Sequence, residues 1–496
     1  MAARLISTWR EWLPPLAVIG LFALVWRMAT FGNPTLHVDD QFYFLVGQAM
    51  HEGKLPYVDM WDRKPPGLFV IYYLIAAISF EPVAYQVVAT LFVVATGFTI
   101  YLAARLWASG RGATFAALLY VAALHMSGGE GGQAPVFYNL FVAIAACALL
   151  RWIADGATRA DRRVWLAMGS LGLALTIKQT VLFEAAAMGL MVLYVLHRSG
   201  AGIAAITRTG AMAVMLGIAP TLAGFLWFAF AGHLEVFWHA MVLSNAAKAY
   251  PDFRTIGARA IIRTLELTPL FVPAALSFIG AQGRFAAFRP FLVAWAIGAL
   301  LGFLSVPNFY LHYTLPLWVP AVTIASRSLD RPLLGPALLI ACISYSALHS
   351  NPFNREWTRL SQEEFAAGVR LINELDSGDT MLVFEGPSAL YRATGRRFLS
   401  PLVFPTHLGW DNERDVSHLK TDAELARVLA ARPDVVVTLV QPRSEPANKT
   451  AWKMLAKYAE QYCNIRRETV IPEIYRRWRT VVYAGCNGNG RLGAEG

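Results

Sequence analysis

The chain has 496 residues, of which 56% are hydrophobic and only 15% are charged. Soluble proteins carry about 25% charged residues, so this composition excludes an ordinary soluble enzyme and predicts a membrane protein with several spanning helices. The net charge of +10 does not indicate a nucleic-acid partner, because Lys and Arg gather in the cytoplasmic loops of membrane proteins and set their orientation.

The apolar segments predict a polytopic α-helical membrane domain. A spanning helix needs about 20 apolar residues, and the chain offers about 11–13 such helices. The first run, Trp12 to Ala29, is too long for a signal peptide and no small-residue cleavage site follows it. Eleven spans are placed at residues 12–30, 83–107, 112–126, 135–153, 164–178, 180–197, 209–231, 264–281, 288–305, 313–327 and 332–348.

The positive charges orient these spans. If all eleven cross and the N-terminus is inside, every cytoplasmic loop is basic. These loops contain Arg105 and Arg111; Arg151, Arg159, Arg162 and Arg163; Arg198 and Arg208; Arg284 and Arg289; Arg327 and Arg331. The agreement requires the short apolar segment 68–80 to lie at the interface or re-enter rather than cross. The loop 31–82 and everything after residue 349 then lie on the outer side.

The composition changes after residue 350. Frequent charges replace the spanning runs. A helical pattern from Ser361 to Leu375 precedes the apolar TMLVFE, and another from Asp422 to Ala431 precedes DVVVTLV. Helices alternating with strands predict a small soluble α/β domain over 351–496, following a membrane domain over 1–350.

The only cysteines of this C-terminal domain are Cys463 and Cys486. The charge pattern places them outside, in an oxidising compartment if the cell is Gram-negative, so we expect a disulfide between them. The alternative is two unpaired thiols.

The polar loop 31–82 lies between apolar segments. It contains the adjacent Arg63-Lys64 pair and five carboxylates: Asp39, Asp40, Glu52, Asp59 and Asp62. Ionisable groups held against a membrane are costly and are therefore candidates for function.

Asp39 and Asp40 lie where a helix is predicted to begin. From Phe42 to Met50, apolar residues recur at the spacing of one helix face, and this helix is expected to lie on the bilayer surface. Two interpretations stay open. Acidic side chains are preferred at N-caps and in first turns, and a carboxylate held rigidly in this way also suits catalysis.

Two lysines are candidates for binding a lipid phosphate. Lys64 precedes Pro65 and Pro66, which stiffen the backbone and favour a helix start. Lys178 ends an apolar run on the predicted outer side, against the positive-inside trend. A lysine is a compact charge suited to phosphate. The alternative for each is a side chain that anchors a helix end at the interface.

Two further loops offer polar groups on the outer side. His312 and Tyr313 lie at the mouth of a span, and Glu130 lies in the Gly-rich SGGEGGQAP. They are candidates for phosphate or sugar hydroxyls, or else are interfacial and solvated residues. The sequence has no Walker-type loop, nicotinamide fingerprint, His/Cys metal cluster or serine-triad motif.

Taken together, these residues resemble the C-fold membrane glycosyltransferases (GT-C). The resemblance is nearest to the bacterial branch with the lipid A aminoarabinose transferase, rhizobial galacturonosyltransferases and protein O-mannosyltransferase relatives, and covers most of residues 30–325. It rests on the pair Asp39-Asp40 followed by Tyr43, on DRKPPG with Asp62, Lys64, Pro65 and Pro66, on the Gly-to-Lys178 spacing, and on HYTLPLWVP from His312.

The resemblance implies a donor in which a polyprenyl phosphate carries one sugar. It places the catalytic carboxylate at Asp39, where it takes the proton of the acceptor hydroxyl, and the phosphate-binding lysines at Lys64 and Lys178. Asp40 departs from the Asp-Glu of many relatives. The acidic pair is also a candidate site for Mg²⁺ or Mn²⁺.

The predicted function is transfer of a monosaccharide to a hydroxyl of a glycolipid or glycan acceptor, such as lipopolysaccharide, at the outer face of a bacterial inner membrane. The alternatives are a protein O-glycosyltransferase and a non-enzymatic transporter or flippase for lipid-linked sugars. The transporter alternative predicts an inverted repeat, and none is visible in the sequence.

Overall fold

The computed structural model describes residues 2–250, 252–443 and 446–487. The fold divides into two compact units, each assembled from separate parts of the chain. The helical unit comprises Met1–Ala29, Gln86–Gly224 and Pro251–Phe353; the mixed unit comprises Thr30–Tyr85, Phe225–Tyr250 and Asn354–Gly496. The boundary after Phe353 lies close to the predicted one. The loop 31–82, which the sequence analysis grouped with the membrane domain, packs in one unit with the C-terminal domain.

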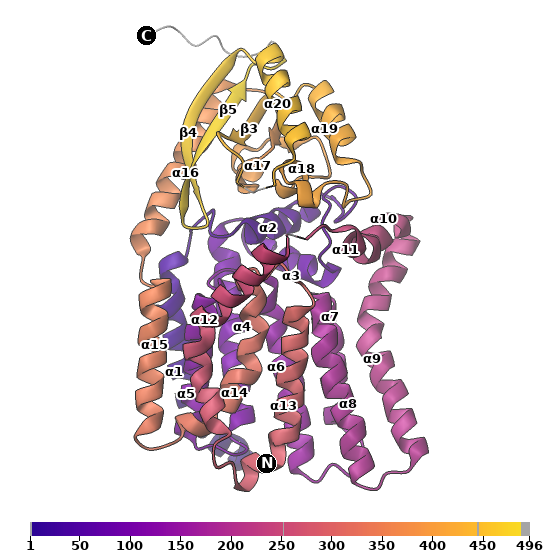
Figure 1. Cartoon of the computed structure of the whole chain (residues 1–496), viewed down its shortest axis with the longest axis vertical. Helices are drawn as coiled ribbons and strands as arrows, with labels where there is room; N and C mark the ends of the chain where they lie inside the picture. The colour runs from indigo at the N-terminus through magenta and orange to yellow at the C-terminus, as the bar shows by residue number, and fades with distance from the viewer. Residues whose placement is uncertain (1, 251, 444–445, 488–496) are drawn as a thin grey trace. The chain divides into compact units, whose positions relative to one another are not determined.

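The helical unit is a bundle of long apolar helices (Figure 1). It contains α1 (Ala2–Arg27), η1 (Met28–Thr30), α4 (Pro82–Ala104), α5 (Gly110–Met126), α6 (Ala134–Ala154), α7 (Arg162–Leu175), η2 (Gln179–Val181), α8 (Leu182–Arg198), α9 (Ile203–Phe230), α12 (Phe253–Ser277), α13 (Gly283–Leu304), η4 (Leu311–Leu317), α14 (Trp318–Leu329) and α15 (Leu334–Ser350). α4 begins and α9 ends in the mixed unit.

The predicted polytopic membrane fold is confirmed. Among the described residues, 7 helices are long and apolar enough to cross a membrane: Glu11–Thr30, Pro82–Ala104, Ala134–Ala154, Gln179–Arg198, Ile203–Phe230, Phe253–Ser277 and Gly283–Leu304. The shorter α5, α7, α14 and α15 coincide with the other four predicted spans, whose crossing stays a prediction. The segment predicted not to cross, 68–80, overlaps α3, which has only 11 residues and is about 16 Å long, far short of a bilayer core.

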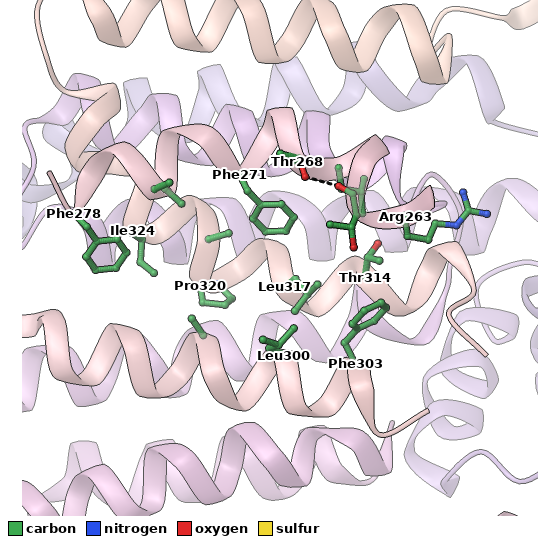
Figure 2. A pocket seen from close by; sticks show the side chains of 16 residues that line it. Arg263, Thr268, Phe271, Phe278, Leu300, Phe303, Thr314, Leu317, Pro320 and Ile324 are labelled. Atoms are coloured by element: carbon green, nitrogen blue, oxygen red, sulfur yellow. Dashed lines mark hydrogen bonds between the residues drawn. The ribbon is translucent and has the colours of Figure 1, made fainter. Parts of the chain in front are cut away.

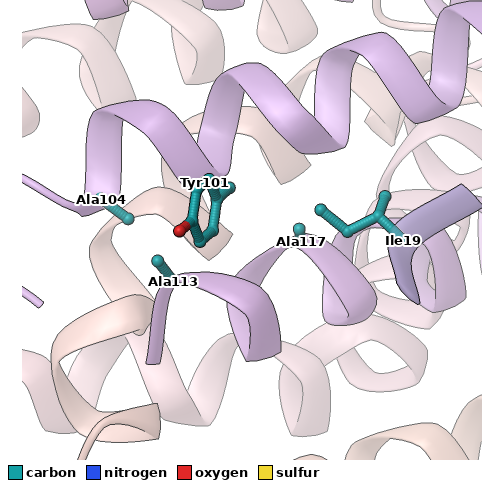
Figure 3. Close-up of a cluster of buried hydrophobic side chains, with 5 residues drawn as sticks. All are labelled: Ile19, Tyr101, Ala104, Ala113 and Ala117. Atoms are coloured by element: carbon teal, nitrogen blue, oxygen red, sulfur yellow. The ribbon is translucent and has the colours of Figure 1, made fainter. Parts of the chain in front are cut away.

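Small residues allow helices of this unit to approach closely. Ala113 and Ala117 of α5 pack against Tyr101 and Ala104 of α4 and against Ile19 of α1 (Figure 3). Lipid is as apolar as a hydrophobic side chain, so helices in a membrane associate through close van der Waals contact, and small side chains make that contact possible.

The mixed unit combines the polar loop with the C-terminal domain. It contains α2 (Val38–His51), α3 (Pro66–Ala76), α10 (Leu234–Trp238), the π-helical turn η3 (His239–Leu243), α11 (Ser244–Ala247), α16 (Arg355–Leu375), α17 (Ala389–Thr394), α18 (Thr406–Gly409), η5 (Asp411–Glu413), α19 (Thr421–Ala430) and α20 (Lys449–Tyr462). Its strands are β1 (Thr380–Val383), β2 (Arg397–Phe398), β3 (Val435–Leu439), β4 (Ile465–Glu473) and β5 (Arg476–Ala484).

These strands form one sheet in the order β2-β1-β3-β5-β4. β1 pairs in parallel with β2 and β3, whereas β5 pairs antiparallel with β3 and β4. Every residue of β3 is buried, as expected for a central strand covered on both faces. The predicted helix–strand alternation is therefore confirmed, with α16 preceding β1 and α19 preceding β3.

The β4–β5 hairpin carries a strained turn. Its two central residues, Ile474 and Tyr475, have φ of 51° and 56°, values that suit a type I′ turn but are uncommon for a β-branched side chain. The Ile474 amide donates to the carbonyl oxygen of Thr35 at 3.4 Å. The hairpin tip is thus tied to the segment that leads into α2.

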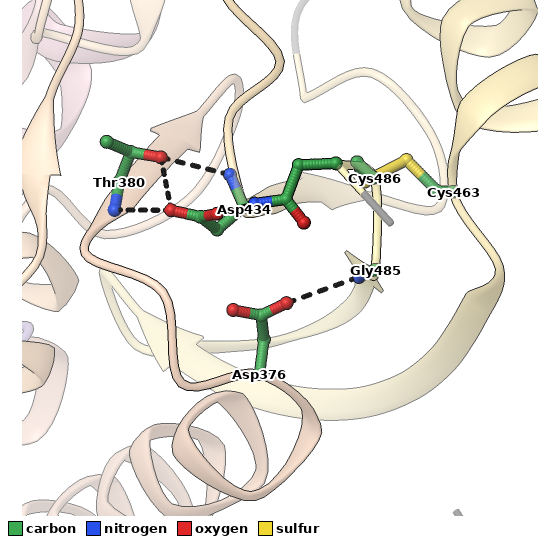
Figure 4. Close-up of a disulfide and its surroundings, with 7 residues drawn as sticks. Asp376, Thr380, Asp434, Cys463, Gly485 and Cys486 are labelled. Carbon is green, nitrogen blue, oxygen red and sulfur yellow. Dashed lines mark hydrogen bonds between the residues drawn. A yellow bond between two sulfur atoms is a disulfide. The ribbon is translucent and has the colours of Figure 1, made fainter. Parts of the chain in front are cut away.

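A disulfide joins Cys463 and Cys486, the pair expected from the sequence (Figure 4). Cys463 follows α20, and Cys486 follows β5. The bond closes a loop of sequence separation 23 around the hairpin. Nearby, Asp434 accepts hydrogen bonds from the amide and hydroxyl of Thr380 (Figure 4), which join the start of β3 to β1.

The disulfide gives a first prediction. Replacing both Cys463 and Cys486 by serine should lower the unfolding free energy of the C-terminal domain by about 3 kcal/mol, because the unfolded chain regains the freedom of that loop. Without reduction, mass spectrometry of denatured, alkylated protein should find the label on Cys147 and Cys342, which are free. Alkylation of Cys463 and Cys486 in the same sample would contradict the bond.

Candidate functional site

The acidic pair lies in the first turn of α2, after the N-cap residue His37. The capping interpretation is therefore wrong in its simple form, because neither Asp39 nor Asp40 is the N-cap. Their place in the first turn still suits the positive end of the helix dipole. Most of α2 is buried, including Asp40 and Gln41, so the helix is a packed element with more than its apolar face covered.

Three carboxylates gather around one buried phenol. Burial raises the pKa of Tyr43, and the negative charges of Asp39, Asp62 and Asp40 raise it further. The Lys64 ammonium lies 5.3 Å from the centre of the same ring. The structure therefore brings together the four predicted site residues of the polar loop, although two of them precede Tyr43 by only a few positions and two follow it by about twenty.

Lys64 directly precedes the start of α3, at the Pro-Pro pair where the sequence predicts a helix start. Pro65 is the N-cap of α3, and Pro66 is its first residue. The Tyr57 hydroxyl donates to the Lys64 carbonyl oxygen at 2.7 Å. The Tyr57 ring is buried against Phe69, Phe228 and Phe237, with ring centres 5.7, 5.3 and 5.1 Å away.

A buried ion cluster lies beside this turn. Arg63 donates to both oxygens of Glu413, at 2.7 and 2.6 Å, and the Lys248 ammonium lies 3.1 Å from one of them. Burial alone would raise the pKa of Glu413, but the charges of Arg63 and Lys248 outweigh it and hold that pKa at about 2. Glu413 is therefore a carboxylate across the physiological range.

The remaining candidates lie in the helical unit. Lys178 is the N-cap of η2 at the turn between α7 and α8, and its ammonium lies 4.8 Å from the centre of the Tyr313 ring. Tyr313 and His312 belong to η4. Tyr313 packs edge-to-face on Tyr310, whose ring centre is 5.5 Å from the Arg259 guanidinium. Two cations thus flank a group of tyrosines.

The Gly-rich loop with Glu130 is held in place by a buried arginine. Arg27, at the end of α1, donates to the carbonyl oxygens of Gly129 and Gly131 at 2.5 and 3.0 Å and to the Thr90 hydroxyl at 3.0 Å. These acceptors solvate a charge that is costly in an apolar bundle. Glu130 lies between the two glycines and is itself buried.

The same loop is tied to the element that carries Tyr313. The Ser127 hydroxyl accepts hydrogen bonds from the Thr314 hydroxyl at 2.9 Å and from the Trp318 indole at 2.7 Å. In the helical unit, therefore, hydrogen bonds join the segment just before Glu130 to the segment that carries Tyr313.

A cavity of about 440 Å³ lies among α12, α13, η4 and α14. Its wall is mostly apolar, with Phe271, Leu300 and Phe303 facing the space and Arg263 near one end (Figure 2). Phe303 also lines a second, smaller pocket that includes Lys178 and Tyr313. The apolar cavity and the pocket of the lysine predicted to bind phosphate thus share one wall residue.

Several site residues were not found from the sequence. Lys248 and Glu413 lie far from Arg63 in the chain, and nothing local indicates their contact. Arg259 was counted only as part of a loop. A signal did exist for Glu184, a lone acid in the apolar run VLFEAAAMGLM; in the structure it accepts from the Trp295 indole at 2.9 Å and lines the pocket of Lys178.

No protein-family model matches the chain, and no curated protein sequence matches it. Solved structures do. The structure of ArnT from Cupriavidus metallidurans bound to undecaprenyl phosphate aligns with a TM-score of 0.63 at 13% identity, covering 96% of this chain and 98% of that chain. The apo structure of ArnT from the same organism aligns with a TM-score of 0.63 at 14% identity, covering 98% of this chain and 99% of that chain. The chain has the ArnT fold.

The likeness to ArnT extends over both the helical bundle and the small sheet domain, because nearly all of each chain is covered. The predicted GT-C fold is thereby confirmed. An oligosaccharyltransferase of Archaeoglobus fulgidus in the apo form is less similar, with a TM-score of 0.47 at 12% identity over 86% of this chain and 69% of that chain.

The environment of His407 predicts a pH dependence of stability. Burial lowers the pKa of His407 to about 4, from an ordinary 6.5. Below pH 6.5 the unfolded chain binds a proton at this histidine that the folded protein excludes. About 3 kcal/mol of the unfolding free energy that is present above pH 6.5 is therefore lost as the pH falls towards 4. The melting temperature of purified protein should fall over this window.

His407→Phe should flatten this pH dependence, because the ring contact with Trp61, at 4.7 Å between centres, is kept and the titrating group is removed. His51→Phe, at an exposed histidine, is the matched control and should keep the wild-type profile. An unchanged profile in His407→Phe would refute the assignment.

Proposed function

We propose that the chain is a membrane glycosyltransferase that moves a monosaccharide from a polyprenyl-phosphate donor to a hydroxyl of a glycolipid or glycan acceptor of the cell envelope. The observation that carries the proposal is the gathering of Asp39, Asp40 and Asp62 around Tyr43, with Lys64 over the same ring. The carboxylates proposed for base chemistry and the lysine proposed to bind phosphate thus lie near one tyrosine, in a chain with the ArnT fold.

The residues have complementary roles in this reaction. Asp39 takes the proton of the acceptor hydroxyl as its oxygen attacks the anomeric carbon of the sugar. The bond from that carbon to the phosphate oxygen breaks, and the polyprenyl phosphate leaves with the electron pair. Lys64 and Lys178 stabilise the charge that develops on the leaving phosphate. Asp40, Asp62 and Glu130 act as acceptors for sugar hydroxyls.

Further features support a lipid-linked donor. The apolar cavity of about 440 Å³ offers space for isoprene units next to the pocket of Lys178. The ArnT structure compared above was solved with undecaprenyl phosphate, a lipid of the proposed class. His312 and Tyr313, near Lys178, are placed to contact the phosphate or the sugar.

A divalent cation fits the acidic pair in one respect. Mg²⁺ is commonly bound by one or two carboxylates together with substrate phosphate, and Asp39 and Asp40 would supply these carboxylates. The ion would add positive charge for the leaving group. Among the described residues, no group of three or more His, Cys, Asp or Glu side chains is arranged to hold a metal, and no step above depends on one.

We place the site and the C-terminal domain on the outer face of a bacterial inner membrane. The support is the distribution of Arg residues among the predicted loops, together with the disulfide between Cys463 and Cys486, a bond typical of oxidising compartments.

The function is tested by assaying purified protein in vesicles with a panel of polyprenyl-phosphate sugars carrying radiolabelled sugar. The proposal expects label on a lipid or glycan acceptor and release of free polyprenyl phosphate. Label on a protein would favour an O-glycosyltransferase. Label that crosses the bilayer with no new bond would favour a transporter and refute the enzyme.

Asp39→Asn should nearly abolish transfer, with a loss of kcat of about a hundred- to ten-thousand-fold expected when a general base is removed. The variant should keep the wild-type melting temperature, because the amide has the same shape. Asp59→Asn is the matched control, since Asp59 belongs to the same loop and faces Lys54 at 3.7 Å. Near-normal turnover by Asp39→Asn would move the base assignment to Asp40.

Lys64→Ala and Lys178→Ala should each raise the donor KM or lower kcat by about ten- to a hundred-fold, as loss of a charged contact to phosphate implies. The acceptor KM should stay the same. Lys54→Ala, at an exposed lysine of the same loop, serves as the control. Unchanged donor kinetics in both variants would remove the phosphate role.

A further inference from the structure

Three distant segments of the mixed unit meet at one carboxylate. Glu413 lies in η5 of the C-terminal domain, Arg63 in the polar loop and Lys248 in the segment after α11. Arg63 binds both oxygens of Glu413, and the Lys248 ammonium is 3.1 Å from one of them. The Glu413 side chain is only 5% exposed and the Lys248 side chain 10%, so water contributes little to their solvation.

Other positive charges act on Lys248. Burial lowers the pKa of Lys248, the nearby charge of Arg63 lowers it further, and Lys64 adds to the effect, whereas Glu413 opposes it. The geometry agrees, because Lys248 and Arg63 contact the same carboxylate and Arg63 directly precedes Lys64 in the chain. Charged groups that are partly removed from water are costly to hold, and the phosphate of a donor bound next to Lys64 and Lys248 would be attracted to both lysines.

Glu413 contacts both Arg63, which precedes Lys64 in the chain, and Lys248, and thereby holds both side chains in place. One guanidinium nitrogen of Arg63 contacts both oxygens of Glu413 and holds the end of that side chain, and Arg63 precedes Lys64 directly in the turn before α3. The contact with Lys248 fixes the end of the 234–248 segment. Without Glu413, Arg63 and Lys248 would repel each other and move apart. His407 is the other titratable group that acts on Glu413, and burial keeps it neutral at pH 7.

We propose that Glu413 is a positioning residue for donor binding, and that Lys248, held by Glu413 beside Lys64, is a further cation that binds the phosphate of the lipid-linked donor. The inference rests on the proposed function and deepens it, because it gives the C-terminal domain a direct part in building the donor site.

The experiment measures two things on the full-length protein: binding of polyprenyl phosphate, which requires no transfer, and donor KM, acceptor KM and kcat. Lys248→Met should weaken binding and raise the donor KM about ten-fold, with an unchanged acceptor KM and melting temperature, because the Arg63–Glu413 pair remains. Glu413→Gln should weaken donor binding at least as much, and Glu413→Asp should restore part of it.

Two controls isolate the effect. Glu52→Gln breaks another ion pair of the mixed unit, with Arg392 at 2.8 Å, and should leave donor binding unchanged. The double variant Glu413→Gln/Lys248→Met should bind donor no worse than Glu413→Gln alone, because both changes act on one contact.

The outcomes distinguish failure of this inference from failure of the proposed function. If the wild-type protein binds polyprenyl phosphate and the Lys248→Met and Glu413→Gln variants bind it equally well, this inference is overturned. The proposed glycosyltransferase function would then still stand. A lower melting temperature with unchanged donor binding would likewise reduce Glu413 to a structural role. Wild-type protein that neither binds polyprenyl phosphate nor transfers sugar would overturn both.

Discussion

The structure depends on one constraint: a charge that is taken out of water must find its partner inside the protein. Arg27 meets this constraint with two backbone carbonyls and a hydroxyl. Glu473 meets it with Arg443 and with Gln41, whose amide donates at 2.9 Å. Glu413 meets it with Arg63 and Lys248. Each of these contacts joins residues from separate parts of the chain.

The same contacts explain why the polar loop belongs to the unit of the C-terminal domain. Gln41, next to the acidic pair, reaches Glu473 at the end of β4. Arg63, next to Lys64, reaches Glu413. The proposed base Asp39 is therefore two positions away from a residue that contacts the C-terminal domain, and Lys64 is one position away from another. That domain helps to hold the site, in addition to following it in sequence.

Local patterns predicted much of the fold. The periodicity from Phe42 to Met50 located α2, the Pro65-Pro66 pair located the start of α3, and apolar runs located β1 and β3. In each case the pattern is set by neighbours within one helix turn or strand. The pairing of Cys463 with Cys486 followed because the domain holds no other cysteine.

What the sequence did not reveal depends on contacts between distant residues. His37, not an aspartate, is the N-cap of α2, and its side chain makes no capping hydrogen bond, so no local capping pattern marks this position. The partners Lys248 and Glu413 are far from Arg63 in the chain, and no local spacing encodes such a meeting. The cavity among α12, α13 and α14 arises from how side chains fill space between helices, which periodicity does not specify.

The central claim is that Lys64, which lies near the acidic pair in the mixed unit, binds the phosphate of the lipid-linked donor. The most direct measurement is photo-crosslinking with a polyprenyl-phosphate analogue that carries its reactive group beside the phosphate, with the labelled peptides mapped by mass spectrometry. The account predicts label on the peptide around Lys64, displaced by excess unlabelled polyprenyl phosphate. A Lys64 peptide without displaceable label would contradict it.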